Sequence, residues 1–150
     1  MAAPEQFPAT RVSARPFYRP LRGFAASCLI GALATDLAYS FTADFIWVDF
    51  SDWLVSIGAA VGVVAFLVGA IELLSRRGWA RPRLPALVFD LVAWAVAVLD
   101  VMVHTRDSWT SVVPWGLALS AIAVLILLVS EWTSRTLRAS PAPVVSERAA

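Results

Sequence analysis

The chain has 150 residues, of which 59% are hydrophobic and 15% are charged, and its formal net charge is +1. This composition is too apolar for a soluble globular protein, and the small net charge excludes a general polyanion or nucleic-acid binder. A single cysteine, Cys28, excludes an intrachain disulfide. The length suits one domain, and the apolar content indicates an integral membrane protein.

The two ends of the chain differ from its middle in composition. Residues 1–20 contain four prolines, and two more lie among the last ten residues. Prolines at this density break up regular structure. We therefore predict disordered cytoplasmic tails at 1–20 and 135–150, on either side of a membrane domain at 21–134.

Four apolar segments between the tails are long enough to cross a bilayer as helices, which takes roughly 20 residues each. We predict the spans at about 23–41, 53–74, 85–104 and 112–132. The first is the weakest, since it contains Ser27, Thr35 and Asp36, and the fourth is the strongest. Together the spans predict an all-α, antiparallel four-helix membrane bundle.

The arginines predict how this bundle is oriented. All twelve basic residues are arginines, and eleven of them precede the first span, separate the second from the third, or follow the fourth. Only Arg106 lies in the other two loops. Because cytoplasmic flanks collect positive charge, both termini are expected in the cytoplasm, with the protein in a bacterial inner membrane. A cleaved signal peptide ending near Ala34 is a weaker alternative, since the apolar run continues to Phe41.

Each predicted span carries a face of small or polar residues, which favours close helix packing in a membrane. The residues on these faces are Ser27, Gly31 and Thr35, with Cys28, Ala32 and Asp36 alongside, in span one; Gly58, Gly62, Ala65, Gly69 and Glu72 in span two; Asp90, Ala93, Ala97, Asp100 and His104 in span three; and Gly116, Ser120 and Ala123 in span four. We expect these faces to point inward, and they could also serve a homo-oligomer or a membrane-protein partner.

Ionisable residues inside the spans are the candidate functional residues. Each would cost about 2.5–3.5 kcal/mol at a helix centre, so they should face the bundle interior or water. The predicted helix directions place Asp36, Asp100 and His104 in an outer cluster and Glu72 with Asp90 in an inner one. These groups could join the helices by hydrogen bonds, or they could carry protons or cations. A lone histidine predicts neither a metal nor a haem site, and we expect no cofactor.

The loop before the fourth span carries the most recognisable motif. The run 103–120 includes Arg106, Asp107 and Trp109, and Arg19-Pro20-Leu21 and Trp47-Val48-Asp49-Phe50-Ser51 lie upstream. With these motifs, residues 19–132 resemble a family of small bacterial four-span membrane proteins, the domain of unknown function 2231. The resemblance implies a fold and a membrane location but no activity.

Two departures from that family bear on function. Its members typically continue Arg-Pro-Leu with His-Pro, where this chain has Arg22-Gly23, and many carry a histidine after the fourth span, where 131–139 has none. The family's histidines suggest a redox or quinone-linked role. We therefore expect a non-enzymatic structural or accessory membrane subunit, with a proton or cation pathway, or an accessory redox component, as alternatives.

Overall fold

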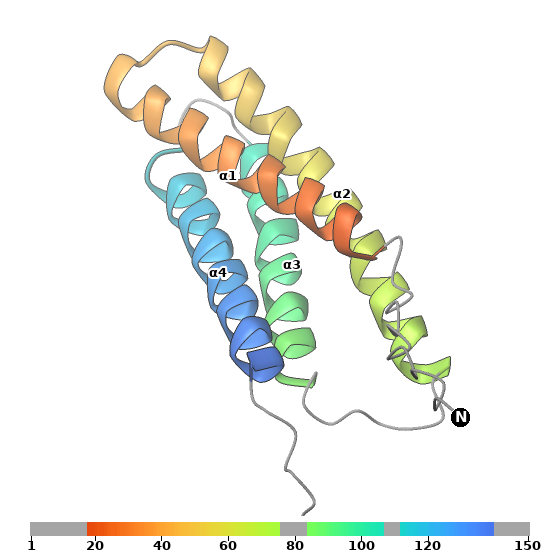
Figure 1. The fold of residues 1–150 in the computed structure, drawn as a ribbon. Helices are drawn as coiled ribbons and strands as arrows, with labels where there is room; N and C mark the ends of the chain where they lie inside the picture. Colours follow the sequence, from red (N-terminus) through yellow and green to blue (C-terminus); the bar gives the residue numbers. More distant parts are fainter. Residues whose placement is uncertain (1–17, 76–83, 107–111, 140–150) are drawn as a thin grey trace, which may run out of the picture.

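A computed structural model describes residues 18–75, 84–106 and 112–139, without the side chains of 72–75, 84 and 137–139. The helices are α1 (Tyr18–Thr42), α2 (Ile46–Ser75), α3 (Leu84–His104) and α4 (Leu117–Ala139), with an irregular turn, η2 (Val112–Gly116), before α4. Figure 1 shows two helical hairpins, α1–α2 and α3–α4, packed side by side. No strand occurs in the described ranges. The predicted all-α four-helix bundle is confirmed.

The outer surface of the bundle is apolar. Four segments are long and apolar enough to cross a membrane: Tyr18–Thr42, Ile46–Ile71, Pro85–His104 and Val112–Thr136. Large side chains such as Phe41, Trp53, Ile71, Met102 and Leu125 are exposed. Apolar surface of this extent marks contact with lipid in a protein of this composition. The chain is therefore a membrane protein with four candidate spans.

The buried positions of all four helices alternate in steps of three and four residues. In α3 they include 90, 93, 97, 100 and 104, and across η2 and α4 they include 116, 120, 123, 127 and 130. In α2 they include 51, 55, 58, 62 and 65. This spacing averages about 3.5 residues and is typical of left-handed bundles. The small-residue faces predicted for α2, α3 and α4 are thus largely used inside the chain, and a partner would contact other surfaces.

In α1 the predicted face of Ser27, Gly31 and Thr35 is not the buried one. Cys28, Ala32 and Asp36 are buried, whereas Ser27 is exposed and its hydroxyl donates to the carbonyl oxygen of Gly23 at 3.0 Å. Thr35 likewise donates within α1, to the carbonyl of Ala32 at 2.8 Å. Hydroxyls that bond to their own helix need no inward partner. The adjacent Cys28–Asp36 face therefore packs against the other helices.

Three helix boundaries differ from the predicted ones. Helix α1 starts at Tyr18, so residues 18–20 are helical rather than tail, because Pro20 lies in a first turn where its missing N–H matters little. Helix α4 continues to Ala139, so 135–139 are helical too. Helix α2 starts at Ile46 instead of Trp53, because Asp44 Oδ1 accepts the N–H of Ile46 at 3.2 Å and caps the first turn.

The link between α1 and α2 is consequently a tight turn of residues 43–45. Ala43 adopts a left-handed backbone conformation with φ of 53°, and its N–H donates to the carbonyl oxygen of Tyr39 at 2.8 Å. This is how many helices end, although glycine is the usual residue there. Asp49 and Asp52, which fall between the first two predicted spans, lie on α2 as a result.

Gly62 on α2 leaves space for the indole ring of Trp94, the one aromatic side chain in the described buried core. A Cβ atom on Gly62 would lie 2.2 Å from Trp94 Cε3, so only a glycine fits against this ring. Trp94 of α3 is 3% exposed and belongs to the same buried apolar cluster as Ala25, Leu29 and Ala97. This contact locks α2 to α3 at the middle of the bundle.

Candidate functional site: two buried polar clusters

Seven buried polar or charged side chains lie in the described part of the chain: Asp36, Ser51, Asp90, Asp100, His104, Ser120 and Ser130. Their hydrogen bonds divide them into two groups. The His104 cluster consists of Asp36, Ser51, Asp100, His104 and Ser120. The Asp90 cluster consists of Tyr18, Arg22, Asp90, Ser130 and Glu131. Asp90 and Asp100 are ten residues apart on α3, or about 15 Å along the helix.

In the His104 cluster, the imidazole lies between two carboxyl groups. His104 Nε2 is 3.2 Å from Asp36 Oδ1, and Nδ1 is 3.1 Å from Asp100 Oδ1 and 3.0 Å from the carbonyl oxygen of Asp100. The histidine and Asp100 are one turn apart on α3, while Asp36 comes from α1. A Cβ on Gly116 would lie 2.7 Å from His104 Cε1, so the glycine before α4 leaves the space that the ring occupies.

Two serines complete the cluster from the remaining helices. Ser51 of α2 donates to Asp36 Oδ1, and its oxygen lies 3.2 Å from His104 Nε2. Ser120 Oγ of α4 lies 2.8 Å from Asp36 Oδ2 and 2.7 Å from Asp100 Oδ2. All four helices therefore meet in one hydrogen-bonded group. Such a group stabilises a bundle only when each member has a partner.

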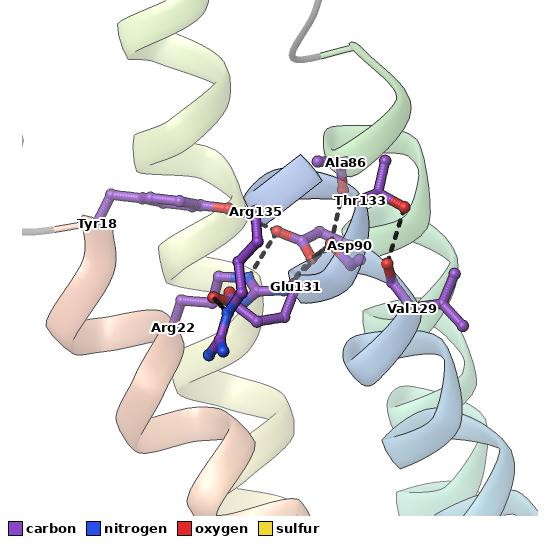
Figure 2. A network of polar contacts seen from close by, with 9 residues as sticks. Tyr18, Arg22, Ala86, Asp90, Val129, Glu131, Thr133 and Arg135 are labelled. Atoms are coloured by element: carbon purple, nitrogen blue, oxygen red, sulfur yellow. Dashed lines mark hydrogen bonds and ion pairs between the residues drawn. The ribbon is translucent and has the colours of Figure 1, made fainter. Parts of the chain in front are cut away.

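The Asp90 cluster is organised around an arginine–carboxylate pair. Arg22 of α1 donates from Nε to Asp90 Oδ2 and from Nη2 to Asp90 Oδ1, both at 2.9 Å. This two-pronged geometry is the strongest form of ion pair between side chains. Tyr18 Oη donates to Asp90 Oδ2 at 2.5 Å, and Ser130 Oγ lies 2.6 Å from Asp90 Oδ1. Figure 2 shows Tyr18 and Arg22 reaching from α1 towards Asp90 on α3.

The Asp90 cluster extends to the surface along α4. Arg22 Nη1 donates to Glu131 Oε2 at 3.2 Å, and Arg135 Nε donates to Glu131 Oε1 at 3.0 Å. Arg22 is 14% exposed at its side chain, Glu131 37% and Arg135 76%. The exposed Arg135–Glu131 pair contributes little to stability, because water screens it. The buried Arg22–Asp90 pair is the core of this cluster.

An apolar layer separates the two clusters. It consists of Ala25, Leu29, Ala32, Val55, Ala59, Ala93, Trp94, Ala97, Ala123, Val124 and Leu127. None of these side chains offers a hydrogen-bonding group other than the Trp94 indole. The two clusters are thus distinct sites near opposite ends of the bundle.

The structure brings together Asp36, Asp100 and His104, as the helix directions suggested. Asp90 lies ten residues before Asp100 on α3, and Arg22, Tyr18 and Ser130 surround its carboxylate. The side chain of Glu72 lies outside the description, so its pairing with Asp90 stays a prediction. Arg106 is exposed beyond α3 and joins neither cluster in the described ranges. Asp107 and Trp109 lie outside the described residues.

Sequence reasoning missed the role of Arg22, which was assigned to the positively charged flank. Its spacing carried a signal: Arg22 and Asp36 are fourteen residues apart, which places both on one face of a helix. Ser120 and Ser130 are ten residues apart on α4, the same separation as that of Asp90 and Asp100 on α3. No group of three or more metal-binding side chains that could hold an ion occurs in the described part of the chain.

Comparisons with known proteins identify a family without naming a reaction. No curated protein and no solved structure matches the chain. The model of one protein family, described as predicted membrane protein (DUF2231), matches residues 23–140. That range includes all four helices apart from residues 18–22 of α1. It contains the whole His104 cluster and, of the Asp90 cluster, all members but Tyr18 and Arg22. The chain therefore belongs to the DUF2231 family of predicted membrane proteins.

Proposed function

We propose that the protein is a non-enzymatic structural or accessory subunit of a bacterial inner membrane, with both termini in the cytoplasm. The observation that carries this proposal is the use of the buried polar groups. Each cluster contacts side chains from three or four helices, and each joins α1 to α3 directly. Polar groups committed to helix–helix contacts in this way hold a membrane bundle in one arrangement.

The two clusters join two helices that make few backbone contacts with each other. The main helix contacts are α1 with α2 and α4, and α3 with α2 and α4. Helices α1 and α3 are diagonal to each other, so long polar side chains are suited to span the distance between them. Arg22 does so at one end and His104 at the other.

A proton or cation pathway is the second candidate. It is favoured by the His104 cluster, where two carboxyl groups and an imidazole lie within hydrogen-bonding distance of shared partners. The apolar layer counts against a continuous route, because an ion or proton needs polar groups or water along its whole path. Nothing in the geometry favours the accessory redox role over these two.

Proteoliposomes separate the two candidates. Protein reconstituted with a pH-sensitive dye inside the vesicles should show no proton flux above that of empty vesicles under an imposed potential. Flux that exceeds this background and falls in a folded Asp36→Asn variant would replace the structural proposal with the pathway.

Cysteine labelling tests the proposed orientation. In a Cys28→Ala background, Thr136→Cys should react with a membrane-impermeant maleimide only from the cytoplasmic side, and Thr105→Cys only from the other side. Both positions are exposed and lie at opposite ends of the bundle. The reverse pattern would contradict the orientation and leave the fold untouched.

A further inference from the structure

We infer that the His104 cluster is a proton-binding site in which Asp100 holds the proton and Ser120 links it to Asp36. This inference goes beyond the proposed structural role and does not depend on it. It comes from counting the hydrogen atoms that the described contacts require, since each hydroxyl has one to donate.

The count begins at Ser120. Its Oγ lies 2.7 Å from Asp100 Oδ2 and 2.8 Å from Asp36 Oδ2, so two carboxyl oxygens face one hydroxyl. The serine hydrogen can satisfy only one of these contacts. The other needs a hydrogen from the carboxyl group itself, because two ionised oxygens against one hydrogen would leave an uncompensated buried charge. One of the two acids is therefore protonated.

The surroundings of the two acids assign the proton. Asp36 receives the Ser51 hydroxyl and the His104 Nε2–H at Oδ1, as an ionised carboxylate requires. Asp100 Oδ1 is buried yet has no hydrogen-bond partner in the described part of the chain, although His104 Nδ1 is 3.1 Å away. That nitrogen bonds to the Asp100 carbonyl oxygen at 3.0 Å instead. A buried oxygen that accepts no hydrogen bond costs less free energy as the carbonyl oxygen of a neutral acid than as an oxygen of an ionised carboxylate. The proton thus belongs on Asp100 Oδ2, donated to Ser120.

The remaining charges balance with this assignment. Both nitrogens of His104 face oxygen acceptors, so the imidazole is a cation that donates twice. One histidine cation, one Asp36 anion and a neutral Asp100 sum to zero. A neutral total is what a cluster with 0–2% exposure requires in a membrane.

The same contacts allow the proton to move. Asp100 Oδ2 can pass its proton to Ser120 Oγ while the serine passes its own hydrogen to Asp36 Oδ2. Asp36 then becomes neutral, Asp100 becomes ionised beside the His104 cation, and the serine hydroxyl is restored. The step needs no other reactant and leaves the net charge unchanged.

We extend the inference to Asp52, which adjoins this site on α2 and would exchange its protons with the surface. It follows Ser51 on α2, is partly exposed, and has a buried Oδ1 with no hydrogen-bond partner among the described residues. It interacts electrostatically with His104 and Asp36 of the cluster, and with the exposed Asp49 one turn away. The titratable groups around the site are thus Asp36 from α1, Asp49 and Asp52 from α2, and Asp100 and His104 from α3. Helix α4 contributes the hydroxyl of Ser120. Protons should exchange at this end of the bundle.

Infrared spectroscopy of the protein in lipid nanodiscs at pH 7 tests the proton on Asp100. The wild type should show the carbonyl band of a protonated carboxylic acid, and Asp100→Asn should lose it while remaining folded. A wild-type spectrum without such a band, or a band that survives in Asp100→Asn, would overturn the inference. If Asp100→Asn does not fold, carboxyl resonances of wild-type protein labelled with ¹³C-aspartate decide the matter. One neutral aspartate is expected, and a fully ionised set contradicts the inference.

Exchange into heavy water tests the connection through Asp52. Asp52→Asn should slow the isotopic shift of the acid band severalfold. Asp44→Asn is the matched control, since Asp44 is exposed at the same end and an asparagine can still cap α2. Equal exchange rates in the wild type and both variants would refute the route through Asp52.

Discussion

The two polar clusters each compensate the charge of a buried carboxylate, but with different chemistry. In the Asp90 cluster a permanent cation, Arg22, pairs with the carboxylate in a two-pronged contact and stays 14% exposed. In the His104 cluster the compensating groups are a histidine and a shared proton, and the side chains of His104 and Asp36 are 1% and 0% exposed. An arginine is charged at any ordinary pH, whereas a histidine and a carboxylic acid are not.

The difference indicates that substitutions of charged residues affect stability differently at the two ends of the bundle. Removing a charge at the Asp90 end should always leave its partner uncompensated. At the His104 end, the effect should depend on which acid is changed, because only one of the two is ionised. Substitutions can therefore separate a fixed ion pair from a site that binds a proton.

The largest effect is expected for Asp36→Asn. The change removes the anion that His104 Nε2, Ser51 and Ser120 contact, so Asp100 must give up its proton to balance the cation. Breaking a buried pair from one side costs about 3–5 kcal/mol. The free energy of unfolding, measured by denaturant titration in mixed micelles, should fall by about 5 kcal/mol, at the upper end of that range. Asp44→Asn, an exposed site, should leave it nearly unchanged. Equal losses for both variants would contradict the role given to Asp36.

Arg22→Met should have the next largest effect. It leaves Asp90 buried, but Tyr18 and Ser130 still bond to that carboxylate. We expect a loss of about 3 kcal/mol, at the lower end of the range for broken buried pairs. The double variant Arg22→Met with Asp90→Leu should regain most of this loss, because an apolar pair carries no buried charge. A double variant less stable than the single one would argue against a buried ion pair.

Gly62→Ala tests the apolar layer between the clusters. Its new methyl group would lie 2.2 Å from the Trp94 ring, and overpacking of this kind costs about 1–3 kcal/mol. Gly23→Ala is the matched control, since nothing lies within 4 Å of a Cβ there. The Trp94 fluorescence should change in the first variant alone, once the other six tryptophans are replaced.

Ala43→Gly should have the smallest effect, and it should be stabilising. A left-handed residue with a side chain is strained by about 1–2 kcal/mol, and glycine removes this strain at an entropic cost of about 0.5–1 kcal/mol. A thermal midpoint slightly above that of the wild type is expected. A clear decrease would mean that the turn at 43–45 is not left-handed.

The fold followed from the sequence because span length and the small-residue faces depend on local composition. The grouping of Asp36 with Asp100 and His104 followed from helix direction and depth. The partner of Asp90 did not follow from the sequence, because pairing Arg22 with Asp90 requires knowing that side chains of α1 reach α3. Arg22 also lies at a boundary where an arginine ordinarily reaches the lipid headgroups. The start of α2 was missed because Asp44, rather than a residue near Trp53, caps the helix.

The most direct test of the comparison is the same substitution in both clusters. Asp90→Asn and Asp100→Asn each replace a buried carboxyl by an amide of the same shape. Because Asp90 is the ionised partner of Arg22 and Asp100 is already neutral, the free energy of unfolding should fall by about 3 kcal/mol in the first variant and by less than about 1 kcal/mol in the second. Equal losses, or a larger loss for Asp100→Asn, would contradict the account.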